Sequence, residues 1–152
     1  MRKHTILVVD DEPNIRDILA YFLQSMGYEV VATGDPDEAL GFAREGRPDL
    51  VLLDVLMPRM DGFDLCQMIR THARSADLPV IFLTALGDEV SRECARVSGG
   101  TRYLQKPFSK EEVLGAVRAL LASRRAGLRR AKGWSHAVRL DSLRPGARSG
   151  SR

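Results

Sequence analysis

Hydrophobic residues along the chain follow two alternating patterns. Short apolar runs, of the kind that form strands covered on both faces, are each followed by a segment whose apolar residues recur every three or four positions, as on one side of a helix. The strand-type runs occupy residues 5–9, 29–33, 50–54, 79–84 and 102–105. Strands that alternate strictly with helices predict an α/β fold, in which a doubly wound, five-stranded parallel sheet carries helices on both faces.

Residues that cap helices mark the ends of the helical segments. Pro13 suits a first helical turn and Gly27 a helix end, whereas Asp35 before Pro36 is a second start signal. A capping box opens at Ser109. These signals predict helices over residues 13–26, 36–45, 62–71 and 88–98, and a fifth that begins at residue 109.

The charge of the chain divides it into two parts. Of its 152 residues, 1–122 hold 14 Lys and Arg against 19 Asp and Glu, whereas 123–152 hold nine against one, which gives a net charge of +3. Arg, Gly, Ser and Ala dominate the second part, and a segment of this length and composition cannot bury a core alone. We therefore expect one domain, residues 1–124, followed by a basic, disordered tail or linker, residues 125–152.

Composition excludes some classes of protein. No apolar run approaches the ~20 residues of a membrane span, and the run near the N-terminus is too short for a secretory signal. We therefore expect a cytoplasmic protein without membrane contact. Cys66 and Cys94 match no metal or redox spacing, so we expect both to be reduced helix residues. His4, His72 and His136 share no ligand spacing and are expected at the surface.

Several polar residues fall where the predicted strands end. In a doubly wound parallel sheet, ligands bind outside the carboxyl ends of the strands. The residues at those ends are Asp10-Asp11-Glu12 after the first strand, Asp54 in the third, Thr84 in the fourth and Lys106-Pro107 after the fifth. Each of these alone is most often a turn or a cap, but their joint placement at one edge of one sheet predicts a functional site.

The residue types at this edge suit phosphoryl chemistry. Two carboxylates ~4 Å apart repel by several kcal/mol, so a cluster of them needs a counter-ion. Oxygen ligands of this kind favour a hard cation such as Mg²⁺. A carboxylate can also attack phosphorus to give an aspartyl-phosphate, whose charge a lysine and a hydroxyl can stabilise.

Four motifs within residues 4–124 resemble the receiver domain of two-component response regulators: ILVVDDEPNIRDIL, LLDVLMPRMDGFDL, FLTA and GGTRYLQKPFSKEEVLGAVRALL. The resemblance implies a flavodoxin-like (βα)5 domain with the strand order 2-1-3-4-5. It implies that Asp54 accepts a phosphoryl group from a sensor histidine kinase or a histidine phosphotransfer protein. It also implies that Asp10, Asp11, Asp54 and the backbone carbonyl of Leu56 hold Mg²⁺ or Mn²⁺.

The resemblance also implies a switch. Thr84 and Lys106 would bind the phosphoryl group, Tyr103 would turn inward as Thr84 moves, and the Lys106–Pro107 peptide bond would be cis. Phosphorylation would then change the surface formed by the fourth helix, the fifth strand and the fifth helix, through which a downstream protein or an output domain is controlled. Such a domain catalyses its own phosphotransfer and slow dephosphorylation and is not a conventional turnover enzyme.

Some positions depart from the pattern of the family. The winged-helix transcription branch usually carries two acids where this chain has Thr101 and Arg102. Half of that branch's dimer salt bridges is therefore missing, although Arg118 looks suitable for the other half, and a homodimer through this face is in doubt. Leu56 and Leu86 are apolar at positions that flank the path of an attacking water, which predicts slow loss of the phosphoryl group.

Other functions remain open at this stage. Output could pass through protein contacts or a part outside this chain, or the basic tail could bind DNA through salt-sensitive, non-specific contacts. The tail carries no recognisable reading motif. An aspartyl phosphatase of the haloacid-dehalogenase kind is the third possibility, but those enzymes resemble D-x-D in the first strand, whereas this chain has DDE there.

Overall fold

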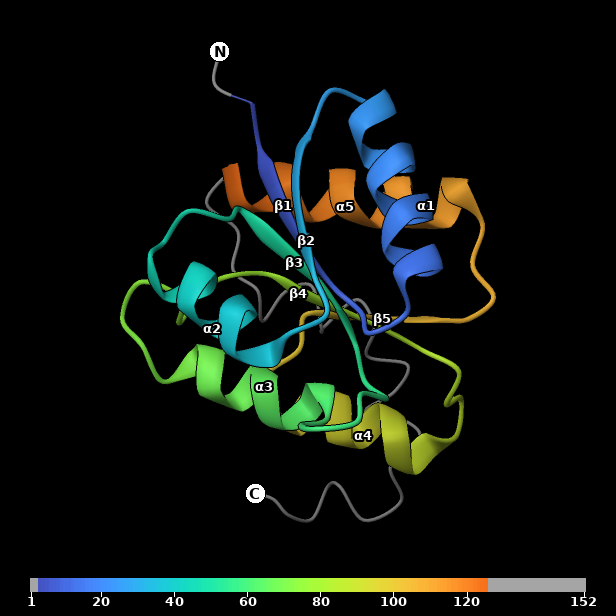
Figure 1. Ribbon diagram of the computed structural model, residues 1–152. Coiled ribbons are helices and arrows are strands. Elements are labelled where there is room, and N and C mark those ends of the chain that lie inside the picture. Colours follow the sequence, from blue (N-terminus) through green and yellow to red (C-terminus); the bar gives the residue numbers. More distant parts are fainter. Residues whose placement is uncertain (1–2, 126–152) are drawn as a thin grey trace.

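The structure is a computed structural model that describes residues 3–125 (Figure 1). Strands and helices alternate along the whole of this range. In order they are β1 (Thr5–Val9), α1 (Pro13–Ser25), β2 (Glu29–Thr33), α2 (Pro36–Arg44), β3 (Leu50–Asp54), α3 (Gly62–Arg70), β4 (Val80–Thr84), α4 (Glu89–Val97), β5 (Arg102–Gln105) and α5 (Lys110–Arg125).

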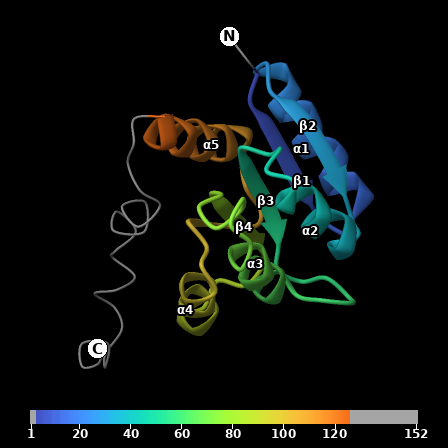
Figure 2. The same ribbon diagram turned by 90° about the vertical axis from the view of Figure 1, so that its left-hand side faces the viewer.

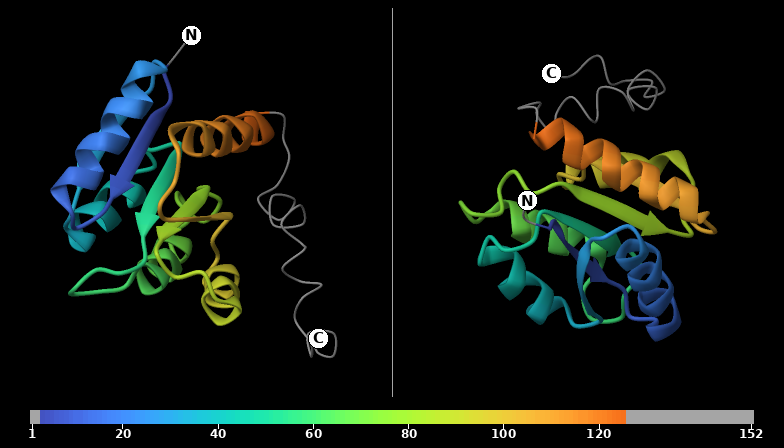
Figure 3. Two further views of the ribbon diagram at one scale, coloured as in Figure 1. Left: turned by 90° about the vertical axis from the view of Figure 1, so that its right-hand side faces the viewer. Right: turned by 90° about the horizontal axis from the view of Figure 1, so that it is seen from above.

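The five strands form one parallel sheet in the order β2-β1-β3-β4-β5, as predicted. The helices α1 and α5 cover one face of the sheet, and α2, α3 and α4 cover the other (Figures 1, 2 and 3). The strands β3 and β4 are buried along their whole length. Because β1 and β3 are neighbours, the residues that follow them emerge side by side at the carboxyl edge of the sheet.

The core consists of two layers, one on each face of the sheet. Successive side chains of a strand point to opposite faces, so Ile6 and Val8 pack with α1 and α5, whereas Leu7 and Val9 pack with α2 and α3. This explains why the strands are apolar runs rather than alternating patterns. The ring of Phe82 meets that of Phe63 edge to face, with 5.2 Å between the ring centres.

The predicted capping residues act at the helix ends. The side chain of Asp35 accepts a hydrogen bond from the Asp37 N–H (2.9 Å) at the start of α2. In the capping box, the Ser109 N–H donates to Glu112 (2.8 Å) and the Glu112 N–H donates to the Ser109 hydroxyl (3.0 Å). Where the predicted helix ends differ from the observed ones, they differ by one residue, because the caps themselves lie half inside the helix.

Of the histidines expected at the surface, His4 is only partly exposed. This residue is half-buried, with its Nδ1 3.6 Å from a carboxylate oxygen of Asp49 and its ring 6.5 Å from that of Tyr28. His72 is exposed, and His136 lies outside the described residues. Within residues 3–125, no helix is both long enough and apolar enough to cross a membrane.

Thr101 has a structural role at the start of β5. It is fully buried, its hydroxyl accepts a hydrogen bond from the Val80 N–H (3.0 Å), and its own N–H donates to the Val80 carbonyl (2.7 Å). The threonine therefore satisfies a buried N–H group where the chain passes from α4 to the edge strand.

We expect Thr101→Val to lower the free energy of unfolding by about 1–3 kcal/mol, because it leaves the buried Val80 N–H without its acceptor. Urea denaturation measures this loss. The matched control is Thr71→Val at the exposed end of α3, which should change the same quantity by less than about 0.5 kcal/mol. Equal losses in the two variants would contradict this role of Thr101.

Candidate functional site

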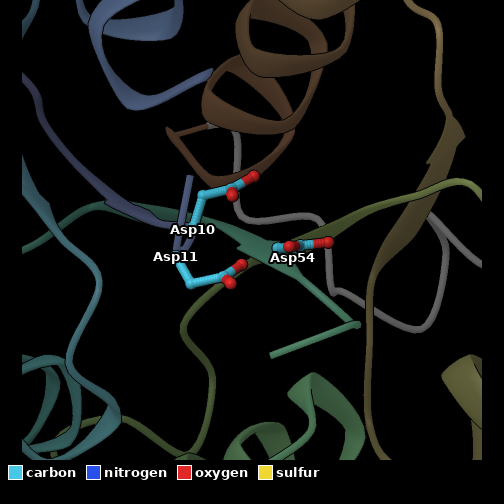
Figure 4. A group of neighbouring side chains, drawn as sticks. All are labelled: Asp10, Asp11 and Asp54. Carbon is cyan, nitrogen blue, oxygen red and sulfur yellow. The ribbon is translucent and has the colours of Figure 1, made fainter. Parts of the chain in front are cut away.

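Three carboxylates meet at the carboxyl edge of the sheet. Asp10 and Asp11 follow β1, and Asp54 ends the neighbouring strand β3 (Figure 4). One carboxylate oxygen from each of these residues lies within 4.8 Å of the other two. Asp10 and Asp54 are 1% and 4% exposed, whereas Asp11 is exposed, so the cluster is closed on the protein side and open to solvent on the other.

The backbone around the acids fixes their side chains. The Glu12 N–H donates to the Asp10 carboxylate (2.9 Å), and the Leu56 N–H lies 3.4 Å from the Asp54 carboxylate. Gly62, at the start of α3, lies against the Asp54 backbone so closely that a Cβ there would come within 2.4 Å of the Asp54 carbonyl oxygen. A glycine is needed at this position for space, and it lets α3 begin directly beneath the Asp54 strand end.

Lys106 follows the edge strand β5 and brings a positive charge to the cluster. Its Nζ lies 3.2 Å from Asp10, 3.5 Å from Asp54 and 3.8 Å from Glu12. The Lys106 N–H donates to the Thr84 carbonyl (2.7 Å), and the Lys106–Pro107 peptide bond is cis. The ammonium group is therefore shared among three carboxylates.

The electrostatics of the cluster favour the arrival of a cation or a proton. Burial, and then the neighbouring charge of Asp10, raise the pKa of Asp54 to about 6, although Lys106 opposes both effects. Burial by itself lowers the pKa of Lys106, but the charges of Asp54 and Asp10 outweigh burial and raise it. The lysine stays protonated, and its single charge does not fully compensate the buried acids.

Thr84 and Tyr103 both bind Leu86, in the loop between β4 and α4. The Thr84 side chain is fully buried and its hydroxyl accepts a hydrogen bond from the Leu86 N–H (3.1 Å). The Tyr103 hydroxyl donates to the Leu86 carbonyl, and burial raises the pKa of this half-buried phenol. The guanidinium of Arg92 lies 5.1 Å from the centre of the Tyr103 ring. A movement of the Thr84 hydroxyl therefore bears directly on the residue that holds Tyr103.

The structure brings the predicted acids and Lys106 into one cluster, with Leu56 beside it. Thr84, at the end of β4, is linked to Tyr103 through Leu86. Sequence reasoning did not identify Glu12 as a partner of Lys106, although its position next to the acidic pair was a usable signal. It also missed Arg92, for which no signal exists, because the sequence does not tell which side of α4 faces β5.

We expect the ionised Asp54 to cost stability. Its pKa is higher in the folded protein than in the unfolded chain, so stability falls as the pH rises from about 4 through about 6. Asp54→Asn should therefore stabilise the metal-free protein at pH 8 by on the order of 2 kcal/mol, and the gain should shrink towards pH 4.

Urea denaturation in the presence of a chelator, at several pH values, measures this gain. The control is Asp17→Asn on the exposed surface of α1, which should show no such growth of stability with pH. A gain for Asp54→Asn that does not depend on pH would contradict the raised pKa.

Comparisons with known proteins agree with this geometry. Residues 6–118 match the response regulator receiver domain family. Over 121 residues the chain is 46% identical to the probable transcriptional regulator ycf27 of Cyanophora paradoxa, covering 80% of this chain and 49% of that protein. It is 43% identical, over 116 residues, to the DNA-binding dual master transcriptional regulator RpaA of Synechocystis, covering 76% of this chain and 48% of that protein.

Among solved structures, the receiver domain of the sensor histidine kinase PA1611 from Pseudomonas aeruginosa superimposes with a TM-score of 0.75 and 30% identity, covering 80% of this chain and all of that one. That structure has a magnesium ion coordinated in its active-site cleft. The chain spans about half the length of the curated relatives it matches. A family match over residues 6–118, on the predicted fold and the predicted strand order, shows that this chain belongs to the response regulator receiver family.

Proposed function

We propose that Asp54 accepts a phosphoryl group from the histidine of a sensor kinase or of a histidine phosphotransfer protein. The observation that carries this proposal is a buried, incompletely compensated carboxylate at the open edge of the sheet, 3.5 Å from a lysine ammonium. The transfer forms a bond between an Asp54 oxygen and phosphorus and breaks the P–N bond to the donor histidine. The electron pair of that bond stays on the imidazole nitrogen.

The donor set fits a magnesium or manganese ion. We assign Asp10, Asp11, Asp54 and the backbone carbonyl of Leu56 as its protein ligands, because hard oxygen donors on a few carboxylates suit such a cation. When bound, the ion neutralises part of the charge on the phosphoryl oxygens. The raised pKa of Asp54 is consistent with this assignment. The excess negative charge that makes the carboxylate hold its proton also favours the binding of an added cation.

Lys106 and Thr84 stabilise the phosphorylated state in this proposal. The ammonium is already within 3.5 Å of Asp54, and the Thr84 hydroxyl retains a proton that it can donate to a phosphoryl oxygen. A phosphoryl group brings about −1.5 to −2 charges into the site. That charge favours the state in which both groups close on it, and the link from Thr84 through Leu86 to Tyr103 passes the change to the surface of α4, β5 and α5.

We propose that residues 1–124 form the receiver unit and residues 125–152 a basic tail or linker. Since the match spans only about half the length of these relatives and one of them is named a DNA-binding regulator, control of a further output domain is the favoured output. The second candidate is direct DNA binding by the tail, favoured by its eight cations. Its mark would be a strongly salt-sensitive gel shift that is lost when residues 125–152 are removed.

Phosphorylation of Asp54 can be tested by intact-mass measurement. We expect incubation with acetyl phosphate or phosphoramidate and Mg²⁺ to add the mass of one phosphoryl group to the wild-type chain and none to Asp54→Ala. A matched control is Asp64→Ala on the exposed surface of α3, which should be modified like the wild type. Addition to Asp54→Ala, or repeated turnover of a separately added phosphate ester without a stable adduct, would overturn the proposal.

Leu56 should slow the loss of the phosphoryl group. Its side chain is 52% exposed at the site, two residues after Asp54, and an apolar group there gives an attacking water no hydrogen-bond partner. We expect Leu56→Asn to shorten the lifetime of the phosphorylated protein severalfold, as followed by intact mass after removal of the donor. Val90→Asn, on the exposed surface of α4, serves as the control with an unchanged lifetime. Equal decay of Leu56→Asn and the wild type would contradict this role.

A further inference from the structure

An arginine of α1 reaches back to the acidic loop. The side chain of Arg16 is half-buried, and its Nη1 donates to the backbone carbonyl of Asp10 over 2.6 Å. This carbonyl belongs to the peptide unit that joins Asp10 to Asp11. The contact is therefore made to the backbone between two of the three clustered carboxylates, and not to the carboxylates themselves.

The Asp10 carbonyl is available because the ladder between β1 and β2 stops here. The Asp10 N–H still donates to the Thr33 carbonyl (3.1 Å), and the next rung of a parallel pair would run from the Asp35 N–H to the Asp10 carbonyl. The Asp35 N–H donates to the Thr33 hydroxyl instead (3.0 Å). Arg16 thus supplies the hydrogen bond that the sheet no longer provides.

Gly34 makes the space in which the guanidinium lies. A Cβ on this residue would come within 2.6 Å of Arg16 Nη1 and 3.2 Å of the Asp10 carbonyl oxygen. Its φ is not in the left-handed region, where Gly27, Gly46 and Gly99 lie, so its backbone does not require a glycine. Gly34 is therefore needed because any side chain there would occupy the space of the Arg16 guanidinium.

We propose that Arg16 is a positioning residue for the cation site: by holding the carbonyl between Asp10 and Asp11, it sets the direction of both carboxylates. This inference rests on the proposed function, in which those carboxylates hold Mg²⁺. Groups that hold metal ligands in place without touching the metal commonly contribute tenfold or more to affinity. A guanidinium suits this task because its fork of donors is rigid and permanently charged.

The charge of Arg16 and its positioning act on cation binding with opposite signs. A positive charge next to a cation site weakens binding, so if charge alone mattered, removing Arg16 would tighten the affinity for Mg²⁺. If Arg16 sets the direction of the carboxylates, removing it weakens the affinity. The direction of the change therefore distinguishes the two roles, and a purely structural role would leave the affinity unchanged.

The experiment is titration of the full chain with MgCl₂ by isothermal titration calorimetry. We expect Arg16→Met to raise the dissociation constant roughly tenfold, and Arg16→Lys, which keeps the charge and a donor group but not the rigid fork, to raise it less. The matched control is Arg118→Met, exposed on α5, which should stay within about twofold of the wild type. An unchanged or lower dissociation constant for Arg16→Met overturns the proposal.

Gly34→Ala provides an independent test that leaves the arginine in place. Its Cβ displaces the guanidinium without removing the charge, so it too should weaken Mg²⁺ binding, and by a smaller factor in the Arg16→Met background. An unchanged affinity in Gly34→Ala overturns the proposal even where Arg16→Met fails to fold.

If the wild-type chain itself binds no Mg²⁺, the proposed metal site fails together with this inference. Normal Mg²⁺ binding by the wild type, with unaffected variants, overturns the role of Arg16 alone.

Discussion

The structure depends on one electrostatic constraint, which is the burial of Asp54 beside Asp10. Each carboxylate is almost fully covered, and each raises the energy of the other in its charged form. The Lys106 ammonium lies within 3.5 Å of both, but it is shared with Glu12 and one charge does not balance three. This imbalance makes the site receptive to a cation, whose charge offsets that of the acids.

The fold holds this acidic cluster in place through the central strand β3 and two closely packed loops. The strand β3 is buried between β1 and β4, which makes its last residue a rigidly held one, and the carboxyl edge of the sheet keeps the same residue within reach of solvent. The loops next to the acids pack closely against neighbouring backbone. Gly62 lies against the Asp54 carbonyl, and Gly34 lies beside the Asp10 carbonyl. The two glycines thus help to position the charged residues, because they let neighbouring segments of backbone approach each other closely.

The sequence predicted the sheet and the acids well because both depend on local patterns. Buried parallel strands are apolar runs, and the end of a run is readable to within a residue, which located Asp54. Contacts between elements distant in sequence were not readable in this way. The buried hydroxyl of Thr101, the contact of His4 with Asp49 and the stacking of Arg92 on Tyr103 each depend on which faces of two elements meet, and that depends on packing in three dimensions.

The helix α4 is the element least committed to the core, and this suits it to respond to the site. Ala95 is its only buried residue within the described chain, and Val90 and Val97 are 71% and 63% exposed. Its carboxyl end is held by Arg70, which donates twice to the Gly99 carbonyl (3.0 and 2.7 Å). Its amino end follows the loop that contains Leu86, whose two backbone groups bind Thr84 and Tyr103. One end of the helix is thus fixed to α3, whereas the other depends on the hydrogen bonds that join Leu86 to Thr84 and Tyr103.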